Sequence, residues 1–183
     1  AEAASSRLPA SAKGATNEVV ETINGIKRKR LGGGDIIVSE MGLGTQRWGS
    51  NDFNAPDEAM CHKFMDRAIL EGGINMIDTA DVYSKWAEGH TGGESEAVLG
   101  RYFAERGNRD RITLASKVGM EMTEAGRGLS REWITCEVEA SLKRLNTDYL
   151  DLYFAHTDDQ NTPLDETMAA FDRLVQDGKV RYL

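Results

Sequence analysis

Short apolar runs alternate with longer amphipathic patterns from about residue 42 to the end of the chain. This alternation is typical of βαβ units, in which each strand is followed by a helix. The pattern predicts parallel strands in sequential order with right-handed crossovers, near residues 41–45, 74–78, 111–118, 149–156 and 180–183. We therefore expect an α/β fold.

Four helices are predicted between these strands. The first follows Pro56, with a core-facing stripe at Met60, Phe64 and Ala68, and ends at Gly72-Gly73. The second covers residues 94–105, and its apolar side consists of Val98, Leu99, Tyr102 and Phe103.

The third helix should begin after Ser130, a favourable N-cap residue, with Leu129 and Ile134 spaced for a hydrophobic staple. For the fourth, Thr162 and Pro163 are expected as N-cap and first residue, with Asp165 placed for a capping box. Its core-facing residues are predicted to be Met168, Phe171 and Val175.

The N-terminal segment has a different composition. Residues 1–16 are rich in Ala and Ser and show no hydrophobic period, and the chain begins with Ala1 rather than Met. We expect a flexible tail over residues 1–25 and a domain over residues 26–183. The tail is similar to what remains after removal of an organelle transit peptide, so we expect a plastid or another organelle, with the cytoplasm as the alternative.

Charge and cysteine content restrict the classes of function. The net charge of −8 argues against a nucleic-acid partner, because phosphate contacts need a surplus of Lys and Arg. The basic run at residues 27–30 is interpreted as a solvated lead-in to the first strand. No apolar run is long enough to span a membrane. Cys61 and Cys136 lie far apart inside helical patterns, which indicates two buried thiols rather than a disulfide.

Four ionisable residues occupy or follow the carboxyl ends of predicted strands, where parallel α/β folds place their function. They are Asp78, Tyr83, Lys117 and His156. Taken singly, each has a structural explanation: a turn cap, a loop anchor, a surface lysine and a core histidine. Together they suit proton transfer to a carbonyl, since a tyrosine needs a nearby cation to act as an acid–base at neutral pH.

The segment Ile77-Asp78-Thr79-Ala80-Asp81-Val82-Tyr83 resembles the aldo-keto reductase motif D-[TS]-A-x-x-Y. The segments Ala115-Ser116-Lys117 and Leu152-Tyr153-Phe154-Ala155-His156 resemble the strand-three lysine and strand-four histidine segments of that family. The resemblance covers about residues 26–183. It implies a (β/α)8 TIM barrel, of which about the first four and a half β/α units are present.

The resemblance also implies roles. Tyr83 would be the general acid, Lys117 would lower its pKa, Asp78 would brace Lys117, and His156 would orient the carbonyl. The implied reaction is NADPH-dependent reduction of an aldehyde or ketone. Thr45, Gln46 and Asp78 match positions near the nicotinamide end of NADPH. Trp48 and Trp86 would line the substrate pocket, although Trp86 is equally consistent with an exposed or core aromatic. No metal is implied.

One departure from the family leaves an alternative open. Most of the family's cofactor contacts come from strands five to eight, which this sequence does not contain. Half a barrel also has two open strand edges, so we expect it to need its missing half, a second copy or another protein. The alternative function is a truncated, non-catalytic barrel that serves as an accessory or scaffold subunit.

Overall fold

A parallel sheet forms the centre of the protein. The computed structural model describes residues 16–123 and 126–183. Within these residues five strands pair in parallel and in chain order: β4 (Gly42–Gly44), β5 (Met76–Asp78), β6 (Thr113–Val118), β7 (Leu150–Ala155) and β8 (Val180–Tyr182). The predicted strand order and direction are confirmed, although β5 begins two residues later than expected.

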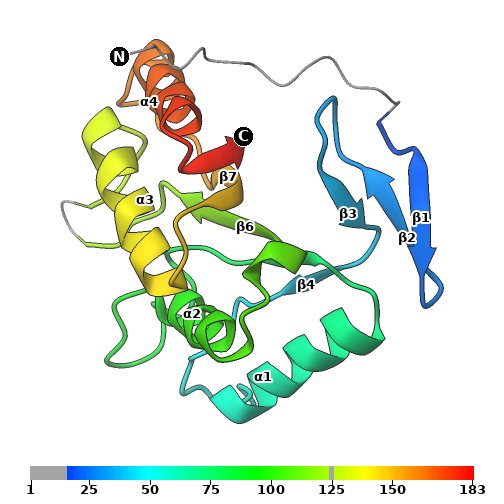
Figure 1. Ribbon diagram of the computed structural model, residues 1–183. Helices are drawn as coiled ribbons and strands as arrows, with labels where there is room; N and C mark the ends of the chain where they lie inside the picture. The colour runs from blue at the N-terminus through cyan, green and yellow to red at the C-terminus, as the bar shows by residue number, and fades with distance from the viewer. Residues whose placement is uncertain (1–15, 124–125) are drawn as a thin grey trace, which may run out of the picture.

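Helices follow the strands and cover one side of this sheet (Figure 1). In the described part they are α1 (Glu58–Asp66), α2 (Glu94–Arg106), α3 (Arg131–Leu145) and α4 (Leu164–Gln176). A π-helical turn, η1 (Arg67–Glu71), extends α1, and a short 3₁₀ helix, η2 (Arg109–Arg111), precedes β6. The core lies between the sheet and α2 and α3, and it includes Leu99, Leu114 and Ile134, all fully buried.

A second, antiparallel sheet precedes the barrel strands. It consists of β1 (Val19–Ile23), β2 (Ile26–Arg30) and β3 (Ile37–Ser39). The backbone N of Ser39 donates to Asn75 Oδ1 at 2.7 Å, which attaches this sheet at the start of β5. The predicted tail boundary at residue 26 is wrong, because β1 already pairs with β2. The first fifteen residues of that predicted tail lie outside the described residues.

The basic run at residues 27–30 is part of β2. Three of its side chains form ion pairs with acidic residues: Arg28 with Glu21, Lys29 with Glu40, and Arg30 with Glu18. Three of the four basic side chains of the run are thus paired locally, as a structural segment would require.

The first helix presents a different face from the one predicted. Asp57 is its N-cap and accepts from the backbone N of Met60 at 2.7 Å, so Pro56 lies outside the helix. Cys61 and Met65 are fully buried, whereas Met60 and Phe64 are exposed. The buried stripe therefore has the predicted period but is shifted by one residue, because cysteine and methionine pack as apolar side chains.

The third helix agrees with its prediction, and the fourth agrees in part. Ser130 caps α3 by accepting from the backbone N of Trp133 at 3.2 Å. In α4, Phe171 is buried but Met168 is exposed, and Pro163 rather than Thr162 is the N-cap residue. Cys61 and Cys136 are both free thiols, but Cys136 is exposed rather than buried. Within the described residues, no helix is both long and apolar enough to cross a bilayer.

The cap of α3 offers a test of this fold. Replacing Ser130 by alanine leaves the backbone N of Trp133 without its side-chain acceptor. We expect Ser130→Ala to lower the free energy of unfolding by about 1 kcal/mol, whereas Ser130→Asn, which keeps an acceptor, changes it little. Urea denaturation of the two variants checks this. Equal stability of Ser130→Ala and the wild type would contradict the assigned helix start.

Candidate active site

The register of the parallel strands brings three predicted site residues to the same edge of the sheet. Asp78 is the last residue of β5 and pairs with Ala115 of β6. Lys117 lies two residues further along β6, beside Phe154 of β7. His156 follows β7 directly, and its backbone N donates to the carbonyl of Val118 at 2.8 Å. All three therefore stand at the carboxyl end of the sheet.

Tyr83 returns to this edge through a tight turn. Its backbone N donates to the carbonyl of Ala80 at 3.3 Å, and the carboxylate of Asp81 accepts from the backbone N of Val82 at 2.6 Å. The backbone N of Asp81 in turn donates to the carbonyl of Lys117 at 3.3 Å, so the turn is tied to β6. The phenol of Tyr83 is thereby held next to the end of that strand.

The Lys117 ammonium lies at the centre of the site. Its Nζ is 2.7 Å from Asp78 Oδ1, 2.7 Å from the Tyr83 hydroxyl and 2.8 Å from the carbonyl oxygen of Thr79. An ammonium group has three protons to donate, and these three acceptors use all of them. The structure thus brings together Asp78, Tyr83 and Lys117, as the sequence predicted.

The hydroxyl of Tyr83 also donates to Asp78 Oδ2 at 3.0 Å. Burial, followed by the negative charge of Asp78 and this hydrogen bond, raises the pKa of Tyr83 above its ordinary value. Lys117 donates to the phenol oxygen and so favours its ionised form, but burial and Asp78 dominate, and the pKa of Tyr83 is raised overall. Tyr83 carries its proton at neutral pH, which is the state that a general acid needs.

His156 stands on the other side of the phenol. The two rings meet edge to face, with their centroids 6.0 Å apart and an interplanar angle of 73°. Burial, and then the charge of Lys117, lower the pKa of His156, so its imidazole is neutral at neutral pH. Its Nδ1 is buried and has no hydrogen-bond partner among the described residues.

Thr45 and Gln46 were assigned, with Asp78, to the nicotinamide end, and they differ in their exposure. Gln46 is exposed, whereas Thr45 is fully buried. The hydroxyl of Thr45 donates to the carbonyl of Asp78 at 2.9 Å and lies 2.7 Å from the hydroxyl of Ser95. The prediction that Thr45 contacts a cofactor is therefore wrong for its side chain, which packs behind Asp78.

The two tryptophans assigned to the substrate pocket also differ. Trp48 is 5% exposed and belongs to the hydrophobic core, so the predicted pocket role is wrong for this residue. Trp86 is half exposed, and its Nε1 donates to Asp52 Oδ2 at 2.7 Å. Trp86 thus keeps an indole face available to a substrate.

A buried group of carboxyls beside the site was not predicted. Asp81, Glu96 and Glu137 are buried around the guanidinium of Arg144, which donates to both glutamates. Burial, and then the charges of Glu96 and Glu137, raise the pKa of Asp81 to about 8. The available signal was the position of Glu137, which lies between the apolar residues Ile134 and Val138 in the predicted third helix.

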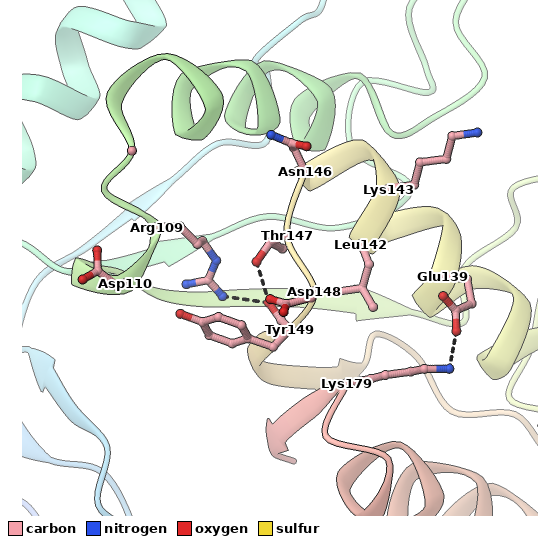
Figure 2. A pocket seen from close by; sticks show the side chains of 11 residues that line it. Arg109, Asp110, Glu139, Leu142, Lys143, Asn146, Thr147, Asp148, Tyr149 and Lys179 are labelled. Atoms are coloured by element: carbon pink, nitrogen blue, oxygen red, sulfur yellow. Dashed lines mark hydrogen bonds and ion pairs between the residues drawn. The ribbon is translucent and has the colours of Figure 1, made fainter.

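A large hollow of the described surface lies elsewhere. It has a volume of about 1010 Å³ and is lined by residues that precede β6, β7 and β8, including Arg109, Tyr149 and Lys179 (Figure 2). Arg109 lies over the ring of Tyr149, 4.2 Å from its centroid, and Lys179 pairs with Glu139. This hollow is at the amino end of the strands, so it is not part of the candidate active site. The described residues contain no cluster of His, Cys, Asp or Glu that could hold a metal ion.

Comparisons with known proteins identify the family to which this chain belongs. The Aldo/keto reductase family model matches residues 40–183. Among curated proteins, the uncharacterized oxidoreductase YrpG of Bacillus subtilis is 38% identical over 84% of this chain, and the aldo-keto reductase YhdN of the same organism is 38% identical over 80%. Norsolorinic acid reductase of Aspergillus flavus is 34% identical over 88% of the chain. This chain belongs to the aldo/keto reductase family.

A solved structure supports the same assignment. The holo form of aldo-keto reductase AKR11C1 from Bacillus halodurans is 38% identical, with a TM-score of 0.70 over 86% of this chain. The parallel sheet described above is thus part of the TIM-barrel fold of the family. The chain spans 49% of that structure, 47% of YrpG, and 42% of both YhdN and norsolorinic acid reductase.

The electrostatics of His156 can be tested directly. Lys117 lowers the pKa of His156 and Asp78 raises it, so removing each charge should move the titration in opposite directions. We expect the midpoint of the His156 ring, followed by NMR, to lie below the ordinary value of about 6.5. It should rise in Lys117→Met and fall further in Asp78→Asn. Shifts of the same sign in both variants would contradict the arrangement.

Proposed function

We propose that this chain provides the proton-donating side of a carbonyl reductase site that uses NADPH. The single observation that supports the proposal most is the convergence of Tyr83, Lys117 and Asp78 at distances of 2.7–3.0 Å, beside a neutral histidine. In this proposal the substrate is an aldehyde or ketone, and the product is the corresponding alcohol.

Tyr83 is the proton donor in this mechanism. When bound, NADPH supplies a hydride to the carbonyl carbon. As negative charge develops on the carbonyl oxygen, the phenol of Tyr83 transfers its proton to that oxygen. The phenolate that results is stabilised by the Lys117 ammonium, which already donates to the hydroxyl at 2.7 Å. Solvent then returns a proton to Tyr83.

Asp78 and His156 have supporting roles. Asp78 accepts from both Lys117 and Tyr83, so it holds the two groups in contact and balances the lysine's charge. His156 is neutral, and its ring lies edge to face against the phenol. A neutral imidazole carries one N–H. In this proposal that N–H donates to the carbonyl oxygen and so fixes the substrate next to Tyr83.

The residues present fit the nicotinamide end of NADPH. Gln46 is exposed directly after Thr45, and the side chain of Asp78 is 37% exposed at the end of β5. An amide and a carboxylate together offer the donors and acceptors that a carboxamide group needs. We assign Gln46 and Asp78 to this contact, and Trp86 to the rim of the substrate pocket.

The proposal also includes a partner. The strands β4 and β8 are the two edges of the sheet, and on its outer side neither pairs with a described strand. A (β/α)8 barrel closes by joining its first and last strands. We propose that another half barrel covers these edges, either as further chain, as a second copy or as another protein. If the assembled protein lacks activity, the remaining function is that of an accessory subunit.

The role of Tyr83 is testable by one substitution and a matched control. In the purified protein we expect Tyr83→Phe to lower kcat for NADPH oxidation with a simple aldehyde at least about hundredfold, the usual contribution of a general acid. KM should change little. The control is Tyr102→Phe, which removes another buried hydroxyl, one that donates to Asp66 far from the site.

Equal rates for Tyr83→Phe and the wild type would remove Tyr83 from its assigned role. If the wild type itself does not oxidise NADPH with any of several aldehydes and ketones, the accessory-subunit function is favoured instead.

A further inference from the structure

Three buried hydroxyls lie directly behind the site. Thr45 is the first residue after β4, Thr79 is the first after β5, and Ser95 lies in the first turn of α2; all three are fully buried. The hydroxyl of Ser95 is 2.7 Å from that of Thr45 and 3.1 Å from that of Thr79. We refer to these three residues as the hydroxyl cluster.

The hydroxyl cluster holds the backbone at the end of β5. Thr45 donates to the carbonyl of Asp78 through its backbone N at 3.0 Å and through its hydroxyl at 2.9 Å. Ser95 also donates to the carbonyl of Thr45 at 2.8 Å, which joins α2 to the end of β4. The carbonyl of Asp78 is therefore held by Thr45 at the end of β4, and the backbone N of Thr79 donates to the carbonyl of Ala115 in β6 at 2.9 Å. Ser95 of α2 holds the side chain of Thr79.

The segment of Asp78 and Thr79 provides two of the three partners of Lys117. The ammonium donates to the carboxylate of Asp78 and to the carbonyl of Thr79, and its remaining proton goes to Tyr83. A rotation of the backbone at Thr79 would move one acceptor away from the ammonium. The third hydrogen bond, to Tyr83, would then have to adjust with it.

We propose that the hydroxyl cluster is a positioning device that sets the distance between Lys117 and Tyr83, with Thr79 as its link to the lysine and Ser95 as its centre. The proposal rests on the proposed function, because Tyr83 is the proton donor in that mechanism. Thr45, Thr79 and Ser95 touch neither substrate nor cofactor in it.

The polarity of the cluster supports a positioning role. Three fully buried apolar side chains would fill the same space without needing hydrogen bonds, and burying hydroxyls is costly unless each is paired. A satisfied buried network, in contrast, rigidifies the backbone and selects one geometry. Every polar contact of these hydroxyls is to another member of the cluster or to the backbone of Thr45 and Asp78.

The test compares isosteric variants in the full chain. Thr79→Val keeps the size of the side chain and removes the hydroxyl, whereas Thr79→Ser keeps the hydroxyl. Ser95→Ala is a second way to open the cluster if Thr79→Val fails to fold. The matched control is Thr167→Val, because Thr167 is also a buried threonine, and its hydroxyl donates to the carbonyl of Leu129 at 3.0 Å.

The first measurement is steady-state NADPH oxidation with a simple aldehyde. We expect Thr79→Val and Ser95→Ala to lower kcat about tenfold while KM for the aldehyde changes less than about twofold, because the proton donor is weakened but substrate contacts remain. Thr79→Ser should restore kcat to within about twofold of the wild type, and Thr167→Val should leave it unchanged. Equal kcat in Thr79→Val, Ser95→Ala and the wild type would overturn the proposal.

The second measurement does not need activity. A lysine ammonium gives a ¹H–¹⁵N NMR correlation only when its protons are held in hydrogen bonds and exchange slowly. We expect such a signal for Lys117, assigned by its loss in Lys117→Met, in the wild type, Thr79→Ser and Thr167→Val. It should be lost in Thr79→Val and Ser95→Ala.

Persistence of the Lys117 signal in Thr79→Val and Ser95→Ala, or its absence from the wild type, would refute the positioning role. These NMR outcomes hold even if the wild type reduces no carbonyl. In that case the proposed function fails, while the role of the hydroxyl cluster is still decided.

Discussion

The Lys117 ammonium is the constraint on which the rest of this site depends. Its three protons are committed to a carboxylate, a backbone carbonyl and a phenol, all within 2.8 Å. The three acceptors come from different parts of the structure. The carboxylate of Asp78 is at the end of β5, the carbonyl of Thr79 follows it beside the hydroxyl cluster, and the phenol of Tyr83 lies in a tight turn. Because all three acceptors share one ammonium, moving any of them changes the other two contacts. The geometry of the site is therefore set by how the fold positions β5, β6 and the turn.

The site could be predicted in part, because the carboxyl ends of parallel strands share one edge. That rule placed Asp78, Lys117 and His156 together from sequence alone. It failed for Thr45 and Trp48, since it locates a residue near the edge but does not say which way its side chain turns after the strand ends. The net direction of the Tyr83 pKa could not be predicted from these positions, because it also depends on burial and on the charge and hydrogen bond of Asp78.

The fold, like the site, could be predicted in part. Strand order and direction follow from the alternation of strand and helix patterns along the chain, and the start of α3 follows from its N-cap residue. Each of these signals is local in the sequence. The buried faces of α1 and α4 cannot be predicted in this way, because each helix carries two apolar stripes about one residue apart. Cys61 and Met65 form the buried stripe of α1, whereas Met60 and Phe64 remain exposed. Only packing against the sheet decides between them, and the sequence pattern contains no information on that contact.

The segment from Asp78 to Tyr83 shows how chemistry and scaffold share one stretch of sequence. Asp78 and Tyr83 contact Lys117 with their side chains, whereas Thr79 contacts it with its carbonyl and uses its hydroxyl to reach Ser95. The hydroxyl of Thr79 is buried, and a serine at this position would offer the same hydroxyl to Ser95. Ala80 is fully buried where the turn begins. The residues between the acid and the phenol are therefore constrained by the position of the ammonium, although neither Thr79 nor Ala80 takes part in proton transfer.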